Sequence, residues 1–215
     1  MRFEQAVRRL AILPEPLPAP AAILLPTIVG GADGVERRRV RTPPPGRPGR
    51  PAAVLVLLFP DDTGVARVVL TERTSRDGHH SGEVSFPGGK AEPDDADLVA
   101  TALREAEEEV ALDANAAGLR VIGLLEPFWI PVSDYAVTPV LAVAERRPEL
   151  VASPDEVARI VEPPVAWFLP DASIEIVERT IGDWPLRYGA YAVDGLSVWG
   201  ATARILSQLG AVLAG

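Results

Sequence analysis

Three features of the sequence predict an α+β fold, an αβα layered sandwich in which a mixed sheet is covered by few helices. A continuous apolar run at Ala53–Phe59 is typical of a buried strand. The segment Asp95–Val110 repeats its apolar residues at helical spacing, and Trp199–Leu213 does the same near the C-terminus. Strand patterns occupy most of the chain around these two helices, which favours the layered arrangement.

The first 50 residues are rich in proline and arginine and precede the predicted main domain. Residues 3–10 are expected to form a short amphipathic helix, and the apolar run Ala21–Val29 could form a strand. The stretch Arg37–Arg50 is predicted to be a loop, because its prolines cannot continue a helix or a central strand. Residues 51–215 are predicted to form the main domain. Residues 1–50 either belong to it or form an interface, so a homodimer is left open.

Strand patterns alternate with turns through the main domain. The turn residues 61–64 lead from the buried run into Ala66–Glu72, which is predicted to pair with that run as a hairpin. Val84–Phe86 is predicted to be a short strand that is stopped by Pro87-Gly88-Gly89. The later predicted strands are residues 119–126 and 135–144, followed by a hairpin of Ile174–Thr180 with Leu186–Val193.

The predicted helix Asp95–Val110 has an apolar face and an acidic face. The positions expected to be buried are Val99, Ala102, Leu103, Ala106 and Val110. Asp95 is the expected N-cap, whose side-chain oxygen would accept a hydrogen bond from an N–H of the first turn.

The composition limits the functions that this chain can have. A net charge of −9 over 215 residues argues against a general nucleic-acid binder, because such proteins need a basic face. The chain has no cysteine, which excludes disulfides and thiolate metal sites. No apolar run reaches the roughly 20 residues of a membrane helix, and no signal peptide is expected at the N-terminus. We therefore expect a cytoplasmic protein that binds a small molecule and neither a membrane nor a nucleic acid.

Three glutamates in the second half of the predicted helix form the main chemical signal. Glu105, Glu108 and Glu109 stand at i, i+3 and i+4, and at roughly 100° per residue they fall on one side of a helix. Like charges at these spacings repel each other, which suggests a counter-ion. Carboxylate oxygens at close quarters suit Mg²⁺ or Mn²⁺. For this spacing taken alone, a solvated acidic face is the alternative.

A glycine loop precedes this helix and reads Phe86-Pro87-Gly88-Gly89-Lys90. Glycine lets backbone groups approach a ligand closely, and the Gly89 carbonyl could reach the same metal. Lys90 could meet a phosphate as a point charge. Arg104 could hold one of the carboxylates by paired hydrogen bonds. The candidate substrate contacts are Arg73, Phe86, Gly88 and Lys90.

The segment Gly89–Leu112 resembles the box motif of the Nudix hydrolase family, G-x5-E-x7-R-E-U-x-E-E-x-G-U, in which U is a bulky aliphatic residue. Its R-E-x-x-E-E kernel is intact in this chain. The resemblance implies a Nudix-like fold in which Glu105, Glu108 and Glu109 bind the metal. It also implies that Arg104 is their electrostatic anchor.

The chain departs from the motif in three places. Its first spacer has one extra residue, Ala96 stands where the motif has its first glutamate, and Ala111 replaces the usual glycine. The longer spacer resembles the coenzyme A pyrophosphatase-like branch, whose upstream signature is L-L-T-x-R-[SA]-x3-R-x3-G-x3-F-P-G-G. The sequence keeps every spacing of this signature from residue 69 to residue 89 and differs from it at Val69, Thr74 and Gly78.

The resemblance implies a metal-dependent hydrolase that cleaves coenzyme A or acyl-CoA to 4′-phosphopantetheine and 3′,5′-ADP. Glu105 and Glu156 are the candidates for the base that takes a proton from the attacking water. Because Gly78 replaces the second arginine of the signature, a Nudix hydrolase for ADP-ribose, NADH or another dinucleotide stays open. Ala96 leaves a third reading open, a non-catalytic nucleotide-binding module. His79 and His80 lie near the loop and could simply be exposed to solvent.

Overall fold

A mixed sheet forms the centre of the computed structural model, which describes residues 1–29, 37–38, 43, 46, 48–74, 83–181 and 184–215. The strands of this sheet are β3 (Arg50–Pro60), β4 (Ala66–Val68), β7 (Gly88–Lys90), β8 (Leu119–Leu124), β9 (Phe128–Ile130) and β10 (Tyr135–Ala144). The long strands β3 and β10 run parallel, whereas β4 and β7 pair antiparallel with β3, and β8 and β9 pair antiparallel with β10. The predicted mixed sheet is therefore confirmed.

Two smaller sheets complete the strand structure of the described residues. One contains β11 (Val157–Val161), β5 (Leu70–Arg73) and β6 (Val84–Ser85), in that order. The other contains β12 (Glu175–Ile181), β13 (Trp184–Val193), β1 (Thr27–Ile28), β2 (Arg37–Arg38) and β14 (Leu196–Val198). The predicted hairpin near the C-terminus is confirmed as the antiparallel pair β12–β13.

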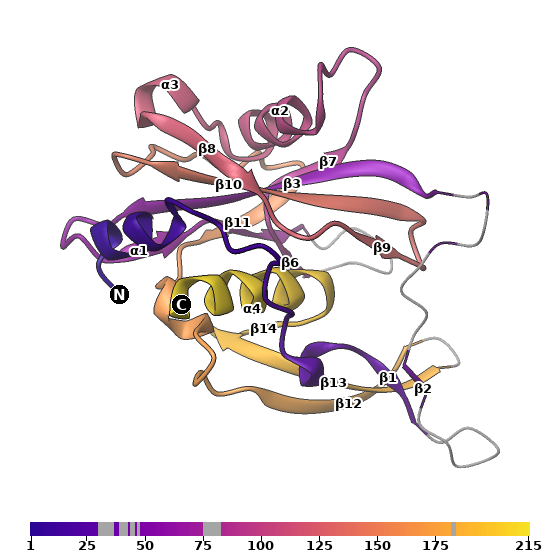
Figure 1. The fold of residues 1–215 in the computed structure, drawn as a ribbon. Helices are drawn as coiled ribbons and strands as arrows, with labels where there is room; N and C mark the ends of the chain where they lie inside the picture. The colour runs from indigo at the N-terminus through magenta and orange to yellow at the C-terminus, as the bar shows by residue number, and fades with distance from the viewer. Residues whose placement is uncertain (30–36, 39–42, 44–45, 47, 75–82, 182–183) are drawn as a thin grey trace.

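Helices cover both faces of the central sheet, as expected for an αβα arrangement. They are α1 (Phe3–Leu10), α2 (Leu98–Val110), α3 (Ala114–Ala117) and α4 (Gly200–Ala214), with short 3-10 helices η1 (Ala22–Leu24) and η2 (Val165–Phe168). Figure 1 shows α2 and α3 on one side of β3 and β10 and α4 on the other, with the sheet of β12 and β13 beyond α4. Within the described part of the chain, no helix is long and apolar enough to cross a membrane.

Strand β3 supplies side chains to both layers because successive residues of a strand point to opposite faces. Leu55 and Leu57 are buried in one apolar cluster with Ala102 and Ala106 of α2. Val56 and Leu58 are buried in the other cluster, which includes side chains of α4. This double burial explains why the run Ala53–Phe59 is continuously apolar.

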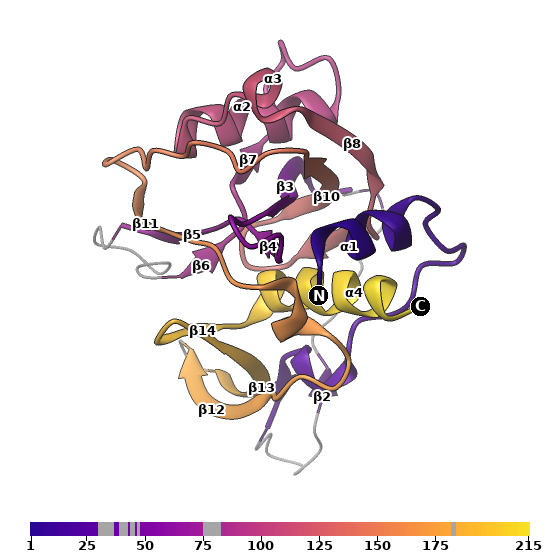
Figure 2. The ribbon, with the colours of Figure 1, turned by 90° about the vertical axis from the view of Figure 1, so that its left-hand side faces the viewer.

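The N-terminal segment contributes to the cluster on the α4 side. Ala6 and Leu10 of α1 and Leu24 of η1 are fully buried there. Arg9 donates a hydrogen bond to the carbonyl of Leu213 near the end of α4. Figure 2 shows α1 beside α4, so the two ends of the chain lie close together.

Some expected boundaries were wrong. The segment predicted as one hairpin arm divides at Val69: β4 pairs with β3, but β5 joins β11 and β6 in a different sheet. The short strand predicted before Pro87 does end there, as β6, but the two glycines that follow form a further strand, β7, with Lys90, since they pair with Ala53 and Val54 of β3. The run Ala21–Val29 contains the 3-10 helix η1, and its only strand is the two-residue β1. The predicted loop after it contains the two-residue strand β2.

Helix α2 begins three residues later than predicted. Asp97 is its N-cap and accepts a hydrogen bond from the backbone N–H of Ala100 at 2.8 Å. Asp95, the expected N-cap, lies in the preceding loop and binds other partners. The prediction failed because Asp95 and Asp97 are both good capping residues by type, and only their three-dimensional neighbours distinguish them.

Candidate active site

The three glutamates of the predicted metal site lie on α2 in different environments. Glu108 is exposed, Glu105 is mostly covered, and Glu109 is buried with 4% of its surface exposed. Glu107 is exposed, as expected for a residue outside the arc. The helix thus carries a row of carboxylates that runs from solvent into the interior.

Glu109 is the most unusual of these side chains. Among the described residues, its Oε2 is the buried side-chain atom that lacks a hydrogen-bond partner. Burial raises the pKa of Glu109 to about 7, although the nearby charge of Arg73 and a hydrogen bond from the backbone of Gly88 act in the opposite direction. A buried carboxylate oxygen without a partner is costly, and a bound cation would satisfy it.

Glu105 lies directly against the glycine loop. A Cβ built on Gly89 would be 2.5 Å from Oε2 of Glu105, so only glycine leaves room for this carboxylate. Burial also raises the pKa of Glu105, and the neighbouring charges of Glu108 and Glu156 act in the same direction, against the pairing with Arg104. The loop and the helix thus form one cradle around the carboxylates.

Gly88 is required for a different reason. Its φ is +154°, and a Cβ there would be 2.4 Å from the carbonyl oxygen of Ala53 in the adjacent strand. The backbone of β7 therefore packs tightly on β3, and this contact fixes the position of Gly89 beside Glu105.

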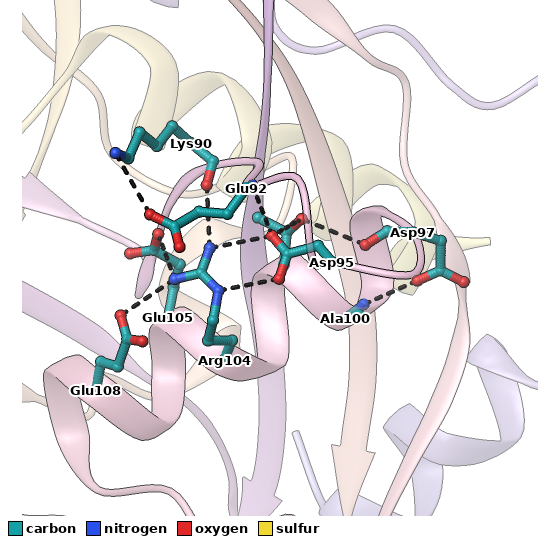
Figure 3. Close-up of polar contacts among 9 residues, drawn as sticks. Lys90, Glu92, Asp95, Asp97, Ala100, Arg104, Glu105 and Glu108 are labelled. Atoms are coloured by element: carbon teal, nitrogen blue, oxygen red, sulfur yellow. Dashed lines mark hydrogen bonds and ion pairs between the residues drawn. The ribbon is translucent and has the colours of Figure 1, made fainter.

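Arg104 is the centre of the polar contacts in Figure 3. Its Nη1 donates to Oε1 of Glu105 at 3.0 Å and to Oε2 of Glu108 at 3.1 Å. Its Nε and Nη2 donate to the two carboxylate oxygens of Asp95 at 3.0 and 3.1 Å. Arg104 therefore contacts two of the three glutamates, as the motif implies for their electrostatic anchor. It also pairs with a further carboxylate, that of Asp95.

Asp95 belongs to the site, although the sequence predicted it only as a helix N-cap. Its carboxylate also accepts hydrogen bonds from the backbone N–H of Glu92 and from the hydroxyl of Thr101, at 2.9 and 2.8 Å. Arg104 and these hydrogen bonds hold the pKa of Asp95 well below its usual range. One feature of the sequence could have indicated this role: Asp95 is adjacent to Ala96, the position at which the motif has a glutamate.

Arg73 and Glu156 come to the same region from β5 and from the turn before β11. Both side chains are exposed, and both charges affect Glu109, since Arg73 lowers its pKa and Glu156 raises it. The two segments are adjacent because β5 pairs with β11 and Thr74 donates its backbone N–H to the carbonyl of Glu156 at 3.0 Å. The structure thus brings both predicted residues close to the buried carboxylate.

The other predicted residues have different surroundings. Phe86 is 1% exposed and packs in the apolar cluster on the α4 side, so its ring has no surface for a substrate; this expectation was wrong. Its match to the motif reflects core packing. Lys90 is exposed, its Nζ lies 3.3 Å from Oε1 of Glu92, and its carbonyl accepts from Arg104. Gly78, His79 and His80 lie outside the described residues.

Within the described ranges, no three acidic or histidine side chains are already arranged in a geometry that could hold a metal ion. In this arrangement Arg104 engages Glu105 and Glu108. The oxygen-only donor set, the unpaired Oε2 of Glu109 and the space left by Gly89 nevertheless fit a divalent cation.

The comparison with protein families agrees with this arrangement, since the model of the NUDIX domain matches residues 49–182. The chain belongs to the Nudix family. The match covers the central sheet, the glycine loop, α2 and the turn that carries Glu156, and so includes every predicted site residue.

Several Nudix proteins are similar to this chain along most of its length. "Nudix hydrolase 15, mitochondrial" and "Nudix hydrolase 22, chloroplastic" of Arabidopsis thaliana are 40% and 39% identical over 167 and 171 residues, or 75% of this chain in each case. The chain spans only 58% and 55% of the length of these two relatives. "Uncharacterized Nudix hydrolase NudL" of Photorhabdus laumondii is 35% identical over 184 residues, which are 83% of this chain and 95% of the relative.

A Nudix structure is also similar to this chain. The crystal structure of a Nudix hydrolase from M. smegmatis, RenU, is 23% identical, covers 66% of this chain and 80% of its own, and superposes with a TM-score of 0.46.

Proposed function

We propose that this Nudix protein is a divalent-metal-dependent hydrolase of nucleoside diphosphate derivatives, with coenzyme A or acyl-CoA as the favoured substrate. The observation that carries the metal-dependent chemistry is the buried, unpaired Oε2 of Glu109 beside Glu105 and the glycine loop. Support for the coenzyme A branch comes from the sequence signature that includes Arg73. The charge of Arg73 itself acts on the Glu109 carboxylate and lowers its pKa.

The residues of the site divide into three roles. Glu105, Glu108 and Glu109, with the Gly89 carbonyl, would hold Mg²⁺ or Mn²⁺, and Arg104 would keep the helix carboxylates in place. A bound metal ion would neutralise the diphosphate oxygens and lower the pKa of a bound water. Arg73 and Lys90 supply positive charge for the phosphates that enter from solvent.

The proton of the attacking water goes to a carboxylate. Glu105 suits this role because its carboxylate lies directly against Gly89 among the proposed metal ligands. Burial raises its pKa. Glu156 is the second candidate, since its exposed carboxylate faces the same region from the turn before β11. Because Glu105 is also a proposed metal ligand, Glu156→Gln is the deciding variant. Loss of its turnover at saturating Mn²⁺ with unchanged Mn²⁺ affinity would assign the base to Glu156, and full activity would favour Glu105.

A hydrolase for ADP-ribose, NADH or another dinucleotide is the second candidate. The sequence favours it at one position, Gly78, where the coenzyme A signature has an arginine. A non-catalytic module is disfavoured, because Asp95 already supplies a carboxylate to Arg104 beside the substituted Ala96.

The test is turnover of a substrate panel by the purified full chain. Coenzyme A, ADP-ribose and NADH are incubated with Mg²⁺ or Mn²⁺, and the products are separated and weighed by mass spectrometry. We expect 4′-phosphopantetheine and 3′,5′-ADP from coenzyme A. Absence of turnover of all three substrates would contradict the enzyme assignment.

The variant Glu109→Gln tests the site itself. We expect kcat/KM to fall by at least about 100-fold, because the amide cannot replace a charged ligand. The metal-free variant should unfold at the same or a higher temperature than the parent chain, since it no longer buries a charge. Glu107→Gln is the matched control on the same helix, and it should keep full activity.

A further inference from the structure

The carboxylate of Asp95 occupies one edge of the Arg104 guanidinium, with Nε bound to Oδ1 and Nη2 bound to Oδ2 (Figure 3). Nη2 also donates to the carbonyl of Lys90 at 3.1 Å, and Nη1 donates to Glu105 and Glu108. These contacts engage all five N–H groups of a planar guanidinium. The paired contact with Asp95 therefore sets the plane in which Nη1 meets the two glutamates.

Asp95 is itself held firmly. Only 8% of its side chain is exposed, and besides Arg104 its partners are a backbone N–H of its own loop and the hydroxyl of Thr101. Thr101 is fully buried on α2. Asp95 therefore connects the loop after Gly89 to the helix that carries the glutamates.

We propose that Asp95 is the positioning residue of this site, acting through Arg104 from the position next to Ala96. It holds Arg104 so that the guanidinium supports Glu105 and Glu108 without fully neutralising them. Without the Asp95 carboxylate, Glu105 and Glu108 would be the acidic partners left to Arg104 among its described contacts, and the guanidinium would compete with a cation for their oxygens. This inference deepens the proposed function and rests on it.

The test measures Mn²⁺ affinity of the full-length chain by calorimetry, with Mn²⁺ alone as the probe. We expect Asp95→Asn to weaken Mn²⁺ binding by about 10- to 100-fold, as is usual when a residue that orients a ligand is removed. The charge control is Asp94→Asn, which removes an exposed carboxylate from the same loop and should change the Kd by less than about twofold.

A second control separates positioning from simple folding of the loop. Thr101→Val removes a hydrogen bond to Asp95 but leaves both contacts with Arg104. It should lower the melting temperature and affect Mn²⁺ binding less than Asp95→Asn does. Equal losses of affinity in Asp95→Asn and either control would overturn the proposal.

A readout in the metal-free protein keeps this test independent of turnover. The Nε–H signal of Arg104 in nitrogen NMR should be shifted and protected from exchange in the parent chain and in Asp94→Asn, and should lose both properties in Asp95→Asn. An unchanged signal in Asp95→Asn would overturn the proposal. If these results hold but no nucleoside diphosphate derivative is hydrolysed, the proposed function fails and the positioning role stands.

Discussion

The carboxylate of Glu105 lies directly against Gly89, so that a Cβ on the glycine would be 2.5 Å from Oε2 of the glutamate. The contact joins the loop that approaches the site to the helix that carries its acids. The atoms that such a Cβ would meet belong to the end of the flexible Glu105 side chain and not to the backbone. A substitution at Gly89 can therefore disturb the site without disturbing the fold.

Replacing Gly89 by alanine should impair the site more than the fold. The added methyl group would displace the carboxylate of Glu105, and we expect kcat/KM with Mn²⁺ to fall by about 10- to 100-fold, since small misplacements of reacting groups have effects of this size. Thermal unfolding should change little. Gly88→Ala is the informative comparison, because its methyl group meets the backbone of Ala53. That variant should lose about 2–3 kcal/mol of folding free energy.

Arg73 should contribute mainly to substrate binding. We expect Arg73→Gln to raise the KM for a diphosphate substrate by roughly 10- to 100-fold, the value of a lost charged hydrogen bond, with a smaller change in kcat. Steady-state kinetics measure both. Arg159→Gln is the control, since it removes an arginine of the paired strand β11 that is bonded to Glu72. A change confined to stability would contradict the assigned role of Arg73.

Ala111 shows why the family motif has a glycine at this position. It ends α2 with φ of 53° and ψ of 37°, a left-handed conformation that is unfavourable for alanine. Ala111→Gly should therefore stabilise the chain by about 0.5–1 kcal/mol, after allowance for the greater freedom of glycine in the unfolded state. Chemical denaturation measures this difference. A destabilised variant would show that the αL conformation at Ala111 is not under strain.

Asp61 should make stability depend on acid pH. The Thr63 hydroxyl, the backbone N–H of Val65 and the side chain of Arg67 hold the pKa of Asp61 well below its usual range. A depressed pKa stabilises the folded state above the unfolded-state pKa, and this contribution is lost as the pH falls toward the folded-state pKa. Asp61→Asn should therefore lower the melting temperature at pH 7 and have a progressively smaller effect below about pH 4. A difference that is constant with pH would contradict this explanation.

Local sequence patterns were sufficient for the main elements of the fold. The helical spacing in the segment before Val110 and at the C-terminus predicted α2 and α4, and the apolar run around Leu57 predicted the central strand. The pattern could not show that β3 pairs in parallel with β10 or that Val69 separates strands of two sheets. Those features depend on contacts between residues that are distant in sequence.

The sequence predicted those parts of the candidate site that depend on spacing within one helix. It did not predict the parts that depend on packing between distant segments. Spacing alone placed Glu105, Glu108 and Glu109 on one arc, but it could not show that only Glu109 is buried without a partner for Oε2. A motif match also could not distinguish Phe86, which packs in the core, from a ligand contact. Asp95 was missed because its role depends on the exact approach of a loop to Arg104.

The most direct test of the metal site is anomalous X-ray diffraction from crystals of the full chain soaked in Mn²⁺. We predict an anomalous peak at coordination distance from Oε2 of Glu109, bounded by the carboxylates of Glu105 and Glu108. The same soak of Glu109→Gln should lose the peak. A peak at another place, or no peak in the parent chain at a saturating Mn²⁺ concentration, would contradict the assignment of these three glutamates.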